Sequence, residues 1–232
     1  MKKLAFGLLG IALLALCAVG LYLRYMSGAA GDPAFFASEI EVFVEADRTA
    51  PPAPGQIVFV GSSSIRFWTT LEQDMAPLRI VRRGFGGAQL SHVVHEAPRI
   101  VIPYAPRAVV VYAGDNDIGA GKSAETVVAD FEALVVLLRA SLPEVDVWFL
   151  SIKPSRLRAS LWPEMAKANA RIRALAEADP RLHYLDVGTV LLGSDGEPSA
   201  DFFRFDGLHL NAAGYAAWTK VVKPVLLDAY GS

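Results

Sequence analysis

The sequence predicts an α/β fold in which a mostly parallel sheet of about five strands carries helices on both faces. From residue 56 onward, short apolar runs rich in β-branched residues alternate with longer amphipathic segments. The apolar runs are nearly continuous, as expected of strands that are covered on both faces. The chain has 232 residues, which is enough for one sizeable domain with an N-terminal extension.

Strands are expected at residues 57–60, 79–82, 108–112, 146–151 and 183–187. The run at 108–112 reads Ala-Val-Val-Val-Tyr and has no polar residue, which is typical of a central parallel strand. Such strands need helical crossovers, and these should be right-handed.

Helices are expected at residues 34–47, 90–97, 123–140, 163–178 and 211–230. Each of the longer segments carries apolar residues at helical spacing. Ser123 is placed to cap its helix, and Pro163 suits a first helical turn.

The N-terminus carries an unbroken apolar stretch at residues 4–23. Twenty residues of helix match the hydrocarbon thickness of a bilayer. Lys2 and Lys3 favour the cytoplasmic side, which places the rest of the chain in the periplasm or outside the cell. We therefore expect a signal anchor or transmembrane helix in residues 1–26. A cleaved signal peptide, which would release a secreted protein, stays open as the alternative.

Composition limits the remaining organisation and the possible partners. The formal net charge is −2 and no basic run occurs, which argues against a nucleic-acid partner. Cys17 is the only cysteine, so the exported part forms no internal disulfide. Residues 27–55 are expected to be a linker with a short helix, and residues 56–232 the main domain. The oligomeric state is left open.

Four short polar clusters carry candidate chemistry, and three of them follow predicted strands. They are Gly-Ser-Ser-Ser at 61–64, Gly-Phe-Gly-Gly at 84–87, Gly-Asp-Asn-Asp at 114–117 and Asp-Gly-Leu-His at 206–209. Carboxyl ends of parallel strands meet at the sheet edge where ligands bind. Each cluster alone suits an ordinary turn, but together they supply what acyl transfer needs: a nucleophile, a base, a group that orients the base, and oxyanion donors.

Residue chemistry suggests a part for each cluster. His209 is the candidate base for a serine of the first cluster, because Asp206 lies one turn away and can hold the imidazole. Glycines of the second cluster let the backbone approach a substrate closely and present an N–H group. Asn116 offers a side-chain amide donor beside them.

These clusters resemble the blocks of the SGNH hydrolases, also called the GDSL esterase/lipase superfamily, over essentially residues 56–230. The resemblance implies a flavodoxin-like three-layer sandwich and a Ser-His-Asp acyl-enzyme mechanism. The family's first block reads Gly-Asp-Ser-[Leu/Ile]. Here Ser62 stands in place of the aspartate, which puts the nucleophile at Ser63, with Ser62 and Ser64 as alternatives one position away.

The resemblance further implies that Asp206 and His209 complete the triad. The Ser63 N–H, the Gly87 N–H and the Asn116 side chain would form the oxyanion hole. Asp117 would have a supporting role, and no cofactor or metal is implied.

Arg82 and Arg83 precede the glycine cluster at 84–87, which we call the glycine loop. Many family members carry asparagine there, so the two arginines are candidates for an anion-favouring rim of the site.

We therefore expect a serine hydrolase of carboxylic esters, acting on small-acyl or lysophospholipid-type substrates. One rival is an envelope polysaccharide O-acetyltransferase or deacetylase with the same triad, and another is a silent binding or scaffold protein. The sequence only weakly indicates a metal site at His92 and His95 with Glu96, because two histidines without a convincing third ligand more often mark an exposed helix face. A glycosidase using Asp115 and Asp117 would leave the other clusters unexplained.

Overall fold

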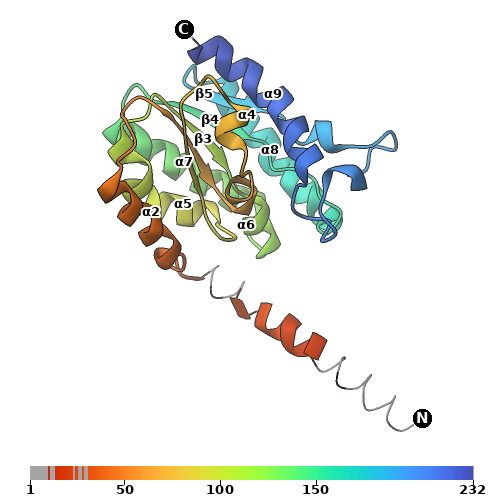
Figure 1. The fold of residues 1–232 in the computed structure, drawn as a ribbon. Coiled ribbons are helices and arrows are strands. Elements are labelled where there is room, and N and C mark those ends of the chain that lie inside the picture. The colour runs from red at the N-terminus through yellow and green to blue at the C-terminus, as the bar shows by residue number, and fades with distance from the viewer. Residues whose placement is uncertain (1–9, 11–13, 23, 26–27, 29–30, 232) are drawn as a thin grey trace, which may run out of the picture.

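The computed structural model describes residues 10, 14–22, 24–25, 28 and 31–231. Strands and helices alternate from β1 to α9, as the sequence predicts (Figure 1). The chain therefore has the expected α/β architecture, with a central sheet between two layers of helices.

Five parallel strands form one sheet in the order β2-β1-β3-β4-β5. The strands are β1 (Ile57–Gly61), β2 (Ile80–Gly84), β3 (Ala108–Tyr112), β4 (Asp146–Leu150) and β5 (Leu182–Leu185). All residues of β1 and β3 are buried, which accounts for their continuous apolar sequence.

The strand order reverses between β1 and β3. From β1 the chain crosses to β2 on one side, then returns to β3 on the other side of β1. In open α/β sheets such a switch point leaves a crevice outside the carboxyl ends of the strands. Gly61 pairs with Gly84 and Tyr112, so β1, β2 and β3 end at one level and release their loops together.

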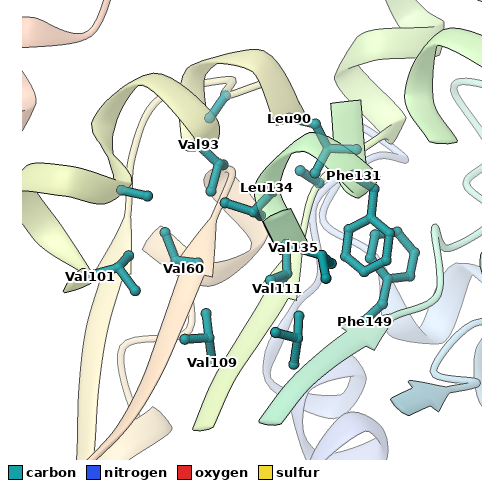
Figure 2. Close-up of a cluster of buried hydrophobic side chains, with 14 of the residues drawn as sticks. Val60, Leu90, Val93, Val101, Val109, Val111, Phe131, Leu134, Val135 and Phe149 are labelled. Atoms are coloured by element: carbon teal, nitrogen blue, oxygen red, sulfur yellow. The ribbon is translucent and has the colours of Figure 1, made fainter. Parts of the chain in front are cut away.

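One face of the sheet is covered by α2 (Ala37–Thr49), α5 (Leu90–Ile100), α7 (Ala124–Ser141) and α8 (Trp162–Glu177). Figure 2 shows Val60, Val109 and Val111 of the strands below Leu90, Val93 and Leu134 of the helices. Phe131 of α7 meets Phe149 of β4 edge-to-face, with 4.8 Å between ring centroids.

The other face packs against α3 (Ser63–Arg66), α4 (Leu71–Asp74) and α9 (Ala212–Tyr230). Ile57, Phe59 and Tyr112 point to this side because side chains alternate along a strand. They meet Trp68 and Trp218, which are fully buried. The sheet thus has a hydrophobic core on each face, and α6 (Asp115–Gly119) lies at its carboxyl edge.

The elements follow the predicted order, with shifts at their ends. The strand at 108–112 is confirmed, and the Ser123 hydroxyl accepts the Thr126 N–H, which confirms the predicted cap. β2 runs on to Gly84, two residues beyond the expected end, whereas β5 ends at Leu185 rather than at residue 187. The helix expected at 34–47 is α2, which begins and ends later.

Among the residues that the structure describes, no helix is both long and apolar enough to span a bilayer. The apolar stretch predicted at 4–23 lies partly outside them, because residues 1–9, 11–13 and 23 are not described.

Candidate active site

The three serines lie in a tight turn between β1 and α3. Gly61 ends the strand with φ +145°, and a Cβ there would lie 1.9 Å from the Tyr112 carbonyl oxygen, so only glycine fits. Ser62 precedes the helix in an extended conformation, and Ser63 is the first residue of α3. The first N–H groups of a helix have no intrahelical partner, so the Ser63 N–H is available to an external acceptor.

Ser63, His209 and Asp206 form a hydrogen-bonded chain. The Ser63 Oγ lies 3.0 Å from His209 Nε2, and His209 Nδ1 lies 2.8 Å from Asp206 Oδ2. An ionised carboxylate only accepts hydrogen bonds, so Nδ1 donates to Asp206. In the neutral imidazole Nε2 is then free to accept the hydroxyl proton of Ser63. The sequence-predicted serine, histidine and aspartate are thus brought together across 146 residues.

The other two serines of the turn lie away from this chain. The Ser62 side chain is fully buried, and its Oγ has no hydrogen-bond partner among the described residues. Ser64 is 2% exposed, and its carbonyl accepts the Tyr215 hydroxyl at 2.9 Å. The geometry therefore favours Ser63 over its neighbours as the serine that faces His209.

Asp206 is held as a carboxylate by its surroundings. Partial burial raises its pKa, but the hydrogen bond from the His209 side chain and those from the backbone N–H groups of His209 and Leu208 lower it to about 2. Both backbone groups donate to Oδ1 at 2.9 Å. Gly207 has φ +65°, which allows the turn that folds these N–H groups back onto the carboxylate. Asp206 therefore carries its negative charge across the neutral and mildly acidic range.

Gly87 and Asn116 are also neighbours. A Cβ built on Gly87 would lie 3.9 Å from the Asn116 Nδ2, which places the loop after β2 against the start of α6. Asn116 Nδ2 donates to the Ala88 carbonyl at 3.2 Å and has a second hydrogen left over. Asn116 follows the end of β3, which is level with the end of β1, from which Ser63 follows. The candidate oxyanion donors and the Ser-His-Asp chain therefore share one edge of the sheet.

Asp117 joins the glycine loop to α6. It is fully buried and accepts the Leu90 N–H at 3.1 and 3.2 Å, which caps the start of α5 directly behind Gly87. Burial raises the pKa of Asp117 to about 6, against the Lys122 ammonium at 3.1 Å and the Leu90 N–H, which lower it. This contact fits the supporting role expected for Asp117.

The two arginines before the glycine loop do not act as a free rim. Arg83 is mostly buried and donates to Asp47 at 2.6 Å and to the Tyr104 hydroxyl at 2.9 Å. Arg82 donates to the Arg66 carbonyl at 2.7 Å. Both guanidinium groups already have protein acceptors. The expected anion-favouring rim is therefore wrong for Arg83, which is mostly buried, and it stays a prediction for Arg82.

The histidines on α5 have structural contacts. His92 and Glu96 are buried rather than exposed as expected. His92 Nδ1 accepts the Gln89 N–H at 2.9 Å, and its Nε2 lies 3.1 Å from the Asp32 carbonyl. Among the described residues, no group of three or more histidine, cysteine or acidic side chains is placed to hold a metal ion.

Sequence reasoning missed a buried group of charges beside Asn116. Lys153 is 1% exposed and lies 3.5 Å from Asp115 Oδ2, and Arg158 lies 3.3 Å from the same oxygen. Both cations follow β4, whose carboxyl end gave no polar cluster recognised as functional. Lys153 lies three residues beyond the end of β4 and Arg158 lies eight residues beyond it, and neither belongs to a recognisable motif.

The chain is similar in sequence to proteins of one hydrolase family. The sequence profile of the GDSL-like lipase/acylhydrolase family matches residues 58–217, which is more than half of the chain. Platelet-activating factor acetylhydrolase IB subunit alpha2 of Gallus gallus is 29% identical over 174 residues, which cover 73% of each chain.

Solved structures share the fold. A Streptococcus pneumoniae protein provisionally named a platelet activating factor has a TM-score of 0.75 at 22% identity, over 91% of this chain and 99% of that one. A GDSL-like lipase from Bacteroides thetaiotaomicron has a TM-score of 0.71 at 19% identity, over 82% and 98%. At these identities the likeness concerns the fold, and the family assignment comes from the profile match. This chain is a hydrolase that belongs to the GDSL-like lipase/acylhydrolase family.

Proposed function

We propose that this protein hydrolyses carboxylic esters through a Ser-His-Asp acyl-enzyme mechanism. The observation that carries the proposal is the hydrogen-bonded chain from Ser63 Oγ through His209 to Asp206. Serine is a weak nucleophile until a positioned base takes its proton, and this chain supplies both the base and the carboxylate that orients it. The mechanism calls for no cofactor or metal.

In the first half-reaction, Ser63 Oγ bonds to the acyl carbon and its proton moves to His209 Nε2. The carbonyl π electrons move onto oxygen, and the N–H groups of Ser63 and Gly87 and the Asn116 amide stabilise that oxyanion. When the oxyanion collapses, the bond to the alcohol oxygen breaks and His209 gives its proton to the departing alkoxide. Asp206 stabilises the imidazolium throughout.

In the second half-reaction, water takes the place of the alcohol. His209 removes a proton from the water, whose oxygen bonds to the acyl carbon. The second tetrahedral intermediate collapses, Ser63 leaves with the proton from His209, and the carboxylic acid is released. The enzyme returns to its starting state.

We propose small-acyl esters, including acetyl esters and lysophospholipid-type esters, as the substrate class. The name of the chicken relative, an acetylhydrolase subunit, supports an acetyl group on the acid side. An acetylated envelope polysaccharide belongs to the same acyl class. If the acyl group moved to a sugar hydroxyl instead of water, the protein would be an O-acetyltransferase.

Hydrolysis of nitrophenyl esters of increasing acyl length tests the proposal. We expect turnover that is fastest with acetate or other short chains and is abolished in Ser63→Ala. Ser62→Ala is the matched control, because it removes a hydroxyl of the same turn that has no hydrogen-bond partner among the described residues. Turnover that survives in Ser63→Ala would overturn the mechanism.

Acetylated sugars and lysophospholipids, offered with and without a sugar acceptor, separate the substrate alternatives. Release of free acid at the same rate with and without acceptor indicates a hydrolase. Acylated acceptor as the main product would indicate a transferase.

We also propose that residues 1–26 anchor the protein in a membrane and hold residues 56–232 outside the cytoplasm, with residues 27–55 between them. The support is the uncharged stretch at 4–23 and the two lysines before it. We expect the full chain to stay in the membrane fraction after an alkaline wash and to be cut by protease added outside the cell. A shortened chain in the soluble extracytoplasmic fraction would instead indicate a cleaved signal peptide.

A further inference from the structure

Arg158 is buried beside Asn116, and both of its terminal nitrogens contact the start of α6. It is 8% exposed, and its Nη2 donates to Asn116 Oδ1 at 3.0 Å. Its Nη1 donates to the Asp115 carbonyl at 2.9 Å and lies 3.3 Å from Asp115 Oδ2. One guanidinium thus binds both the backbone and the side chains at the start of α6.

These contacts fix which end of the Asn116 amide faces which neighbour. A guanidinium only donates hydrogen bonds, so the atom toward Arg158 must be the oxygen. A carbonyl only accepts, so the atom toward Ala88 must be the nitrogen. Both partners give the same orientation, and a flipped amide would face a donor with a donor and an acceptor with an acceptor.

We infer that Arg158 is a positioning residue for the oxyanion hole, and this inference rests on the proposed function. By holding Oδ1, Arg158 keeps the free Nδ2–H of Asn116 on the side of Gly87, where the oxyanion would form. The guanidinium charge beside Oδ1 also polarises the amide, and this makes the Nδ2–H group a stronger hydrogen-bond donor. Preorganised donors are what such a site needs.

The surroundings hold Arg158 firmly in this position. A Cβ on Gly119 would lie 3.0 Å from the guanidinium carbon, so the side chain packs directly on the backbone of α6. The Leu157 N–H donates to the Gly207 carbonyl at 3.0 Å. The Arg158 loop is therefore joined to the loop of Asp206 and His209, and it links the oxyanion side of the site to the base side.

Asp115 links Arg158 to a second buried cation. Asp115 Oδ2 lies 3.3 Å from Arg158 Nη1 and 3.5 Å from Lys153 Nζ. Burial raises the pKa of Asp115, but these two cations outweigh it and keep the pKa below its ordinary value. Asp115 therefore stays a carboxylate that helps to hold Arg158 against Asn116.

A double-mutant cycle on the full chain tests the inference, with nitrophenyl acetate as substrate. Asn116→Ala should lower kcat by about 100-fold, as expected for one oxyanion donor. Arg158→Met should lower kcat by about 10- to 100-fold with KM nearly unchanged, because the contact matters only when the oxyanion forms. Combining the two should give no further loss than Asn116→Ala alone, because Arg158 acts through Asn116.

Two further variants keep the test decisive. Arg158→Lys retains the charge beside Asp115 but not the planar fork, and we expect a smaller loss of kcat that again vanishes in the Asn116→Ala background. This variant replaces Arg158→Met in the cycle if the latter does not fold. Arg139→Met is the matched control, because it removes an arginine–aspartate pair with Asp179 and should lower stability without changing kcat.

The inference is overturned if Arg158→Met matches the wild type, or if its loss multiplies with that of Asn116→Ala. The first outcome would show that Asn116 needs no help, and the second that Arg158 acts independently of Asn116. Failure of the proposed function looks different, because Ser63→Ala and Asn116→Ala would then leave turnover intact.

Discussion

The carboxylate of Asp206 keeps its negative charge because of the hydrogen bonds in the turn that carries it. Three hydrogen bonds from residues 208 and 209 meet its two oxygens, and they lower its pKa to about 2 although partial burial opposes them. Asp206 therefore carries its negative charge across the neutral and mildly acidic range.

Asp206→Asn should lower kcat by about 10⁴-fold, because an amide can hold the wrong tautomer of the imidazole. Steady-state kinetics of the wild type and the variant on nitrophenyl acetate measures this loss. A variant as active as the wild type would argue against a histidine base that Asp206 orients.

The pKa of Asp117 is raised, whereas that of Asp206 is lowered. Its pKa of about 6 lies above its ordinary value, so the stability linked to this group is fully present below about pH 4 and is lost as pH rises through 6. Asp117→Asn has no such titration. The free energy of unfolding of Asp117→Asn, measured relative to that of the wild type, should therefore rise by about 3 kcal/mol between pH 4 and pH 7.

Urea unfolding of the two proteins across that pH range gives this difference directly. Curves that stay parallel would show that Asp117 titrates alike in the folded and unfolded chain.

At the scale of elements, α2 supports the glycine loop from outside the sheet. Glu39 accepts the Gly86 N–H at 3.0 Å and binds Arg66 of α3 at the same distance. The ring of Phe36, which precedes α2, fills the place that a Cβ on Gly86 would need. A helix in the segment expected to be a linker thus fixes the loop that carries Gly87.

Glu39→Ala should lower kcat roughly tenfold, because the loop loses a hydrogen bond to a charged acceptor and is held less firmly. Glu41→Ala is the matched control, because it removes a carboxylate of the same helix that binds Arg99 and Arg48 instead. Steady-state kinetics of both variants checks the difference. Equal activity in the two would show that α2 does not act on the loop.

The carboxyl end of β2 is an element boundary that the sequence did not predict. The strand was expected to end at residue 82, before the glycine cluster at 84–87, yet Arg83 and Gly84 both lie in it. The acceptors of the two arginines come from distant parts of the chain: Asp47 and Tyr104 for Arg83, and the Arg66 carbonyl for Arg82. Such partners are invisible in a local pattern. By contrast β3 has only apolar residues, and both of its ends were predicted.

Across the whole molecule, two cores hold the sheet rigid so that its carboxyl edge can carry the site. Phe131 of α7 is fully buried against Phe149, as Figure 2 shows. Phe131→Ala should lower the free energy of unfolding by about 3–5 kcal/mol, because it opens a cavity in this core.

Val136 of the same helix is 68% exposed, and Val136→Ala should change the free energy of unfolding by less than about 0.5 kcal/mol. Urea unfolding measures both. A small effect at Phe131 would mean that α7 does not pack on the sheet as described.

The parts of the site differ in how far the sequence could predict them. Ser63, Gly87 and Asn116 stand directly after strands, and His209 follows Asp206 at short spacing, so their juxtaposition followed from strand order and motif. Arg158 is different, because nothing in its neighbourhood marks it. Its proposed role depends on Gly119 leaving space and on Asn116 lying opposite, 42 residues away in the sequence, and a local pattern does not show such packing.

Labelling of the full chain with a fluorophosphonate, followed by peptide mapping, tests most directly that Ser63 is the activated nucleophile. We predict one phosphonate adduct, on Ser63, that is lost in Ser63→Ala and retained in Ser62→Ala. An adduct on Ser62 or Ser64, or no adduct on folded protein, would contradict the mechanism.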